Sequence, residues 1–250
     1  MKIAFLTPEY PLPRFGNFGG IGTSILNLAK GLVAEGNDVS ILVYGQKEDY
    51  LFEEEGIVFY SIKNIKCKGF SWYFTRKKIE KLLNKLHKEN KIDIVEAPDW
   101  TGITSFIKTS CPLVIREHGT DTYFCHLDER KVKFKNYFHE KRALKKATAI
   151  ISVSEFTGNL TNTLFGLKRR FSVIPNSIDT NFFKPESQES NDTILYFGSL
   201  IRKKGLLELP FIFNKVVESN PNAKLILVGK DVPDIISGNS STWAMLQSLF

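Results

Sequence analysis

Short apolar runs alternate along this chain with longer stretches in which apolar residues recur every three to four positions. The apolar runs predict buried parallel strands, and the helical spacing predicts amphipathic helices that pack on them. We expect strands near residues 2–8, 38–45, 57–62, 92–100, 112–121, 148–154, 171–175, 193–199 and 223–230. Strands that alternate with helices predict an α/β fold, a Rossmann-like, doubly wound parallel sheet.

Helices are expected between these strands, at 23–36, 79–86, 101–108, 129–147, 155–166 and 206–219. Residues 53–55 are expected to form an acidic turn. The polar stretch 186–192 has no periodicity and predicts a linker. We therefore expect an N-terminal Rossmann-like domain at 1–190 and the start of a second such domain at 191–250, which has too few residues to complete a doubly wound sheet.

The composition is that of a globular protein, with 42% hydrophobic and 24% charged residues. The three cysteines show no CxxC spacing, which fits a reducing compartment and argues against a disulfide framework or a zinc site. No signal peptide is recognisable, and no run approaches the roughly 20 apolar residues of a membrane span. These features predict a cytoplasmic protein.

The net charge of +7 is concentrated in two segments. Residues 63–91 hold ten basic and two acidic residues, and residues 130–146 hold eight basic and one acidic residue. Both segments fit solvated helix faces, and both fit attraction to an anionic membrane surface or a phosphorylated ligand. The aromatic cluster at 70–74 likewise fits a membrane interface or the core. Nucleic acid is disfavoured as a partner because no recognised binding motif accompanies the charge.

Glycines follow the first strand and lead into the first helix. Gly20 and Gly22 would let the N-terminus of that helix approach a phosphate, whose charge the free N–H groups favour. A loop that only turns tightly is the alternative. The spacing is not GxGxxG, because Ile25 occupies the position of the third glycine, which argues against a nicotinamide or flavin dinucleotide site.

Polar side chains also follow two later strands. Glu96 and Asp99 end the fourth strand, where two carboxylates would orient the hydroxyl groups of a polyol, although Asp99 equally fits a helix cap. His118 and Asp121 follow the fifth strand, where open α/β sheets bind ligands. A histidine satisfied within the core is the alternative for His118.

Four stretches together resemble the retaining nucleotide-sugar glycosyltransferases of family 4. They are FGGIG (18–22), EHGTD (117–121), SVIPNSIDTNFFKP (172–185) and ILYFGSLIRKKGLLEL (194–209). The resemblance implies two Rossmann-like domains in the B-type glycosyltransferase fold. It implies transfer of a sugar from a nucleotide-diphosphate-sugar to an acceptor with retention, without a metal or other cofactor.

The resemblance also implies roles for single residues. His118 would be the catalytic contact to the donor sugar, and the acceptor would lie near Glu96, Asp99 and Asp121. The donor diphosphate would be bound by Gly20, Gly22, Ser199, Arg202 and Lys204, with Lys204 neutralising the charge that develops on the leaving group.

Two departures from the family pattern qualify these roles. Ser199 stands where the family usually has arginine, and Arg202 in the same turn is a candidate replacement. The family's downstream glutamate motif does not occur in the 250 residues. We therefore expect an N-terminal part of an enzyme that does not turn over alone.

The acceptor implied by the two basic segments is a glycan or lipid-linked sugar at the inner membrane face, in cell-surface polysaccharide assembly. The rival interpretations are a non-catalytic module that binds a membrane or an acceptor, and a sugar-nucleotide epimerase of the same architecture.

Overall fold

The computed structural model describes residues 1–16, 18–184 and 192–249. The chain divides into two compact units, Met1–Phe183 and Lys184–Phe250, and each is described by itself. The linker expected at 186–192 lies outside the described residues, apart from Asp192.

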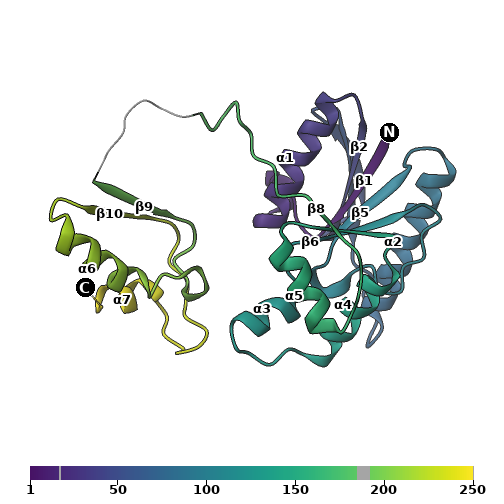
Figure 1. The fold of residues 1–250 in the computed structure, drawn as a ribbon. Coiled ribbons are helices and arrows are strands. Elements are labelled where there is room, and N and C mark those ends of the chain that lie inside the picture. The colour runs from purple at the N-terminus through teal and green to yellow at the C-terminus, as the bar shows by residue number, and fades with distance from the viewer. Residues whose placement is uncertain (17, 185–191, 250) are drawn as a thin grey trace. The chain divides into compact units, whose positions relative to one another are not determined.

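The first unit is built on an eight-stranded sheet with the order β3-β4-β2-β1-β5-β6-β7-β8 (Figure 1). The strands are β1 (Lys2–Thr7), β2 (Asp38–Gln46), β3 (Tyr50–Glu54), β4 (Ile57–Lys63), β5 (Ile94–Pro98), β6 (Leu113–Glu117), β7 (Ala149–Ser152) and β8 (Ser172–Val173). All neighbouring strands pair in parallel except β3 and β4. The order reverses between β1 and β5, which is the switch point at which such sheets bind ligands. The predicted α/β, Rossmann-like fold is confirmed.

Helices cover both faces of this sheet. They are α1 (Gly20–Ala34), α2 (Ser71–Lys88), α3 (Asp121–Leu127), α4 (Phe134–Lys146) and α5 (Glu155–Phe165), with 3-10 turns η1 (Pro13–Phe15) and η2 (Trp100–Gly102). Ser154 caps α5 by accepting a hydrogen bond from the backbone N–H of Thr157, and Gly166 ends it in a left-handed conformation, as the sequence predicts.

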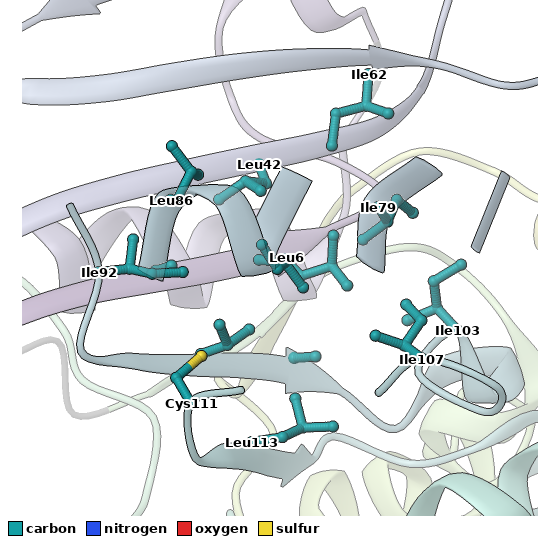
Figure 2. Packing of buried hydrophobic residues seen from close by; sticks show 14 residues of the cluster. Leu6, Leu42, Ile62, Ile79, Leu86, Ile92, Ile103, Ile107, Cys111 and Leu113 are labelled. Carbon is teal, nitrogen blue, oxygen red and sulfur yellow. The ribbon is translucent and has the colours of Figure 1, made fainter. Parts of the chain in front are cut away.

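The central strand β1 is buried on both sides because its side chains alternate between two cores. Ala4 and Leu6 join the cluster that α2 covers, which also contains Ile79 and Leu83 (Figure 2). Ile3 and Phe5 join the cluster beneath α1. Truncating Leu6 or Phe5, which are fully buried, to alanine costs about 2–5 kcal/mol of stability, so both layers hold the carboxyl edge of the sheet in place.

The prediction of a helix at 101–108 is wrong. Only η2 forms there, and Thr101, Gly102 and Phe106 have φ values of +51°, +58° and +77°. The backbone of Gly102 lies against α4 so closely that a Cβ would fall 2.3 Å from the carbonyl carbon of His139. Arg76 donates to the carbonyls of Gly102 and Ile103 and holds the segment as a loop.

Two further differences concern short elements. The acidic turn expected at 53–55 is largely strand β3, which is antiparallel to β4 and turns at Glu55 and Gly56, both with positive φ. The helix α3 was not predicted, because its seven residues follow the expected strand directly.

The second unit contains the parallel strands β9 (Thr193–Phe197) and β10 (Lys224–Val228). With them are η3 (Arg202–Lys204), α6 (Leu209–Ser219) and α7 (Thr242–Gln247). A small core includes Leu206 and Leu246. The other side of the two strands bears four exposed apolar side chains, namely those of Leu195, Phe197, Ile226 and Val228. Across the described part of the chain, no helix is long and apolar enough to cross a membrane.

Candidate functional site

The N-terminus of α1 lies beyond the carboxyl end of β1. Gly20 is its first residue, and a Cβ on Gly20 would meet no atom of a described residue within 4 Å. Gly22 is packed more closely, since a Cβ there would lie 3.4 Å from Phe18 and from Glu9. The carboxylate of Glu9 accepts a hydrogen bond from the backbone N–H of Gly22, at 2.9 Å. An internal anion thus already occupies one donor of this helix terminus, while the side of Gly20 stays open.

Asp99 anchors the loop that carries His118. Its carboxylate accepts hydrogen bonds from the backbone N–H groups of His118 and Gly119, at 3.1 and 3.2 Å. The side chain is buried, and burial raises the pKa of Asp99 to about 7 against the effect of these two donors. The carboxylate makes no cap bond to η2, so the helix-cap alternative for Asp99 is not realised.

The turn after His118 requires glycine and leads directly into α3. Gly119 has φ +107°, and a Cβ there would lie 2.9 Å from the ring of Phe124. Thr120 caps α3 by accepting a hydrogen bond from the backbone N–H of Tyr123. This turn is therefore fixed at both ends.

Glu140 of α4 supports the same turn from beneath. Its carboxylate accepts hydrogen bonds from the backbone N–H groups of Asp121 and Thr122, at 3.0 and 3.3 Å, and from the Thr122 hydroxyl, at 2.5 Å. A carboxylate at a helix N-terminus satisfies otherwise unpaired donors and favours the helix dipole. Sequence reasoning did not select Glu140, although its being the single acid of the second basic segment was a signal.

His118 is half-buried at the carboxyl end of β6. Burial, aided by the charge of Arg116, lowers the pKa of His118 to about 4. The imidazole is therefore neutral near pH 7 and can donate from one nitrogen and accept at the other. Within residues 1–16, 18–184 and 192–249, no group hydrogen-bonds this ring.

Glu96 and Arg116 form a buried ion pair across β5 and β6. Arg116 donates to both carboxylate oxygens of Glu96, at 2.7 and 3.2 Å. It also donates to the carbonyl of Ile174, at 3.2 Å, beyond β8. The pair thus ties three strand ends together, and the carboxylate of Glu96 is engaged within the protein.

Asp121 is the more accessible of the carboxylates after β6. It begins α3, is half-buried, and accepts a hydrogen bond from the Asn136 side chain at 2.8 Å. A carboxylate oriented by one amide retains acceptor sites for a further hydroxyl group.

Further polar groups at this edge were missed from the sequence. Glu117 is buried, its Oε2 has no hydrogen-bond partner in the described part of the chain, and burial raises its pKa to about 8. Asn176 accepts a hydrogen bond from the Ser24 hydroxyl at 2.9 Å, and Asn27 donates to the carbonyl of Ser177 at 3.0 Å. The segment after β8 is thereby attached to α1. The signal for Glu117 was an acid inside an otherwise apolar run.

The second unit has its own polar cluster at the carboxyl ends of β9 and β10. Arg202 forms a two-pronged ion pair with the buried Asp234, at 2.9 and 2.8 Å, which holds the pKa of Asp234 well below its usual value. The charge of Arg202 is therefore already neutralised. This position of Arg202 does not favour the role of replacing the arginine that Ser199 lacks.

Lys204 differs from Arg202. Its ammonium lies over Gly198, where a Cβ would fall 2.6 Å from Nζ, and it forms no ion pair with any described residue. The backbone of Gly229 lies against the backbone of Gly198, since a Cβ added to Gly229 would overlap the carbonyl oxygen of Gly198. The carbonyl of the neighbouring Ser199 accepts a hydrogen bond from Tyr196 at 2.9 Å. The lack of a side chain at Gly198 thus leaves room beside the strand end for the ammonium of Lys204, which has no ion-pair partner among the described residues. The described residues contain no group of three or more His, Cys, Asp or Glu side chains that could hold a metal ion.

Comparison with known proteins identifies the family. The sequence model of glycosyltransferase family 4 matches residues 18–182. This chain belongs to glycosyltransferase family 4. It is 28% identical over 255 residues to an uncharacterized glycosyltransferase of Methanocaldococcus jannaschii, covering 92% of this chain and 63% of that relative. The chain thus spans less than two thirds of the relative's length.

Solved structures agree on the fold. The catalytic domain of starch synthase IV from Arabidopsis thaliana, bound to ADP and acarbose, has a TM-score of 0.62 at 14% identity, covering 99% of this chain and 71% of that one. A UDP-forming α,α-trehalose-phosphate synthase from Burkholderia xenovorans has a TM-score of 0.56 at 12% identity, covering 99% and 68%. The predicted family and its B-type fold are therefore confirmed.

Proposed function

We propose that this family 4 chain is part of an enzyme that transfers a sugar from a nucleotide-diphosphate-sugar to an acceptor, with retention at the anomeric carbon. The observation that carries the proposal is the His118 loop at the carboxyl end of β6, the strand next to β5 at the switch point of the sheet. Asp99 and Glu140 fix this loop, and the imidazole it presents is neutral and unpaired with any described group. A neutral imidazole held in this way is suited to hydrogen-bond a sugar hydroxyl beside the reacting carbon.

The diphosphate leaving group requires a positively charged side chain beside it. The bond between the anomeric carbon and the diphosphate breaks through an oxocarbenium-like state, and charge develops on the departing diphosphate. Lys204 is our candidate for that charge, because its ammonium is unpaired among the described residues whereas Arg202 is committed to Asp234. The open side of Gly20 supports a role in the approach of the diphosphate to α1. Gly22 and Ser199 remain proposed donor contacts.

The acceptor side is proposed to centre on Asp121. The carboxylates of Glu96 and Asp99 are engaged with Arg116 and with the His118 loop. These two are therefore proposed to position the acceptor pocket, and Asp121 to contact an acceptor hydroxyl directly.

The nature of the acceptor is the least constrained part of the proposal. A glycan or lipid-linked sugar in cell-surface polysaccharide synthesis fits the two basic segments. The same segments fit an enzyme that acts in the cytoplasm at an anionic membrane surface. The uncovered apolar side of β9 and β10 supports the idea that further chain packs there in a longer enzyme.

Replacing His118 tests the proposed chemistry in the full-length protein. We expect His118→Ala to lower kcat by about two to three decades with an assayable sugar acceptor, since a contact used in the transition state is lost. His118→Gln should retain part of the activity. His126→Ala is the matched control, because His126 is exposed on α3 of the same unit.

Product analysis separates the rival functions. Transfer releases a nucleoside diphosphate and forms a glycoside whose anomeric configuration, read by NMR, matches that of the donor. An epimerised sugar-nucleotide would favour the epimerase, and an inverted product would overturn retention. Near-normal turnover in His118→Ala would overturn the role of His118.

A further inference from the structure

The two basic segments of the sequence meet on one surface of the first unit. Trp72, near the start of α2, lies 4.9 Å between ring centroids from His139 of α4 and 5.5 Å from Phe106. Phe106 in turn lies 6.2 Å from Phe138 of α4. Helices α2 and α4, which are more than 40 residues apart in the sequence, are thereby joined through aromatic rings.

The outward face of α4 combines exposed aromatic rings with basic side chains. Phe134 and Phe138 are 80% and 42% exposed, with ring centroids 6.4 Å apart. Lys141 and Lys145 follow further along α4, one turn apart. Together with Phe134 and Phe138 they line a groove of about 290 Å³. Lys135 extends the charge toward α2, with its Nζ 5.8 Å from the Trp72 ring. We call Trp72, Phe134, Phe138, Lys135, Lys141 and Lys145 the aromatic–basic patch.

The inward face of α4 explains why this patch carries no negative charge. His139, Glu140, Ala143 and Leu144 are buried. Glu140, the one acid of the helix, accepts its hydrogen bonds from the start of α3. The outward face is left with cations and exposed apolar rings alone, whereas a merely solvated helix face usually mixes charges of both signs.

We infer that the aromatic–basic patch docks the protein on an anionic lipid bilayer. Lysine ammonium groups reach lipid phosphates while their alkyl stems and the phenyl rings enter the interfacial layer. The net charge of +7 adds long-range attraction to such a surface. This inference rests on the proposed action at an anionic membrane and names the surface of the protein that binds it. It does not depend on how the donor sugar is bound or transferred.

Co-sedimentation of the chain with vesicles tests the docking. We compare vesicles of phosphatidylcholine alone with vesicles of phosphatidylcholine mixed with phosphatidylglycerol. The chain should bind the mixed vesicles, and binding should fall as salt rises. Replacing Lys135, Lys141 and Lys145 with glutamine should lower the partition coefficient by about a hundredfold, since each basic residue near such a leaflet contributes roughly fivefold.

A second variant separates the rings from the charge. Phe134→Ser combined with Phe138→Ser leaves every charge in place and should lower partitioning by about tenfold or more, because two apolar side chains no longer enter the interface. The matched control replaces Lys81, Lys85 and Lys88 with glutamine. These exposed lysines lie about 14–24 Å from Trp72 along the axis of α2. That control removes the same charge and should lower partitioning much less than the patch variant.

Several outcomes would overturn the inference. These are the absence of binding to mixed vesicles, equal binding to both vesicle types, or an equal loss in the control and patch variants. Concentration-dependent self-association that disappears in the phenylalanine variant, without lipid binding, would instead assign the face to a second copy of the chain. Thermal melting of each variant confirms folding. In the full-length protein, transfer to a soluble acceptor should be unchanged by each of these sets of substitutions, so a failed docking test leaves the proposed catalysis standing.

Discussion

Replacing Gly20 with alanine separates what the glycine loop does for the fold from what it does for a ligand. Gly20 begins α1, its φ is not positive, and a Cβ there would meet no atom of residues 1–16, 18–184 or 192–249 within 4 Å. Alanine loses less conformational entropy than glycine on folding, so the variant should be more stable by about 0.5–1 kcal/mol. For a unit of this size that corresponds to a rise in Tm of roughly 1–4 °C.

The expected effect on donor binding has the opposite sign. Backbone N–H groups bind a diphosphate only if the ligand comes close to the helix terminus, and a new methyl group on the open side would obstruct that approach. We expect the affinity of the full-length protein for UDP or ADP to fall at least tenfold, about 1.4 kcal/mol. Isothermal titration calorimetry measures this, and urea denaturation measures the stability.

Gly31→Ala is the matched control. Gly31 lies in the same helix, and a Cβ on it also meets nothing within 4 Å. It should stabilise the protein to a similar extent without changing nucleotide affinity. If Gly20→Ala leaves affinity unchanged, the diphosphate does not use this terminus. If Gly20→Ala destabilises the protein, the space beside Gly20 is not open to a methyl group.

Two buried carboxyl groups give further predictions. The pKa of Glu117 is raised to about 8, so its ionisation opposes folding, and stability is lost as pH rises from about 4.5 toward 8. Glu117→Gln should therefore gain stability relative to wild type between pH 5 and pH 8, on the order of 2–4 kcal/mol in urea denaturation. A difference that does not change with pH would refute this. Glu140→Ala should cost about 2–4 kcal/mol, because the start of α3 loses its acceptor, and Glu140→Gln less. Equal stability of all three proteins would contradict that role.

The sequence predicted the strands of the first unit better than the connections between them. Strand β1 is recognisable because its continuous apolar run agrees with burial on both faces, with Ala4 and Leu6 in one core and Ile3 and Phe5 in the other. The segment 101–108 has helical spacing, but the close contact of Gly102 with α4 and the hydrogen bonds from Arg76 decide its conformation. Such contacts join residues far apart in the chain, and local patterns do not contain them.

For the candidate site, too, local patterns predicted some features and distant contacts decided others. His118 could be selected because a polar residue directly follows a buried strand. The partners that engage Glu96 and Arg202, namely Arg116 and Asp234, are 20 and 32 residues away, so neither pairing follows from spacing. The sequence therefore predicted which residues gather at the strand ends, and the structure distinguished Lys204, which forms no ion pair with a described residue, from Arg202, which does.

The position of Glu140 has a consequence for how the first unit responds to its surroundings. One helix presents the aromatic–basic patch on its outer side and, on its inner side, the carboxylate that holds the turn after His118. If a ligand shifted α4 from outside, the hydrogen bonds of Glu140 to the backbone of Asp121 and Thr122 would change, and with them the free energy of that turn. Such a coupling is reciprocal, so occupancy near His118 would alter affinity at the patch by the same factor. The single acid of the helix is then the point through which two separate binding equilibria are linked.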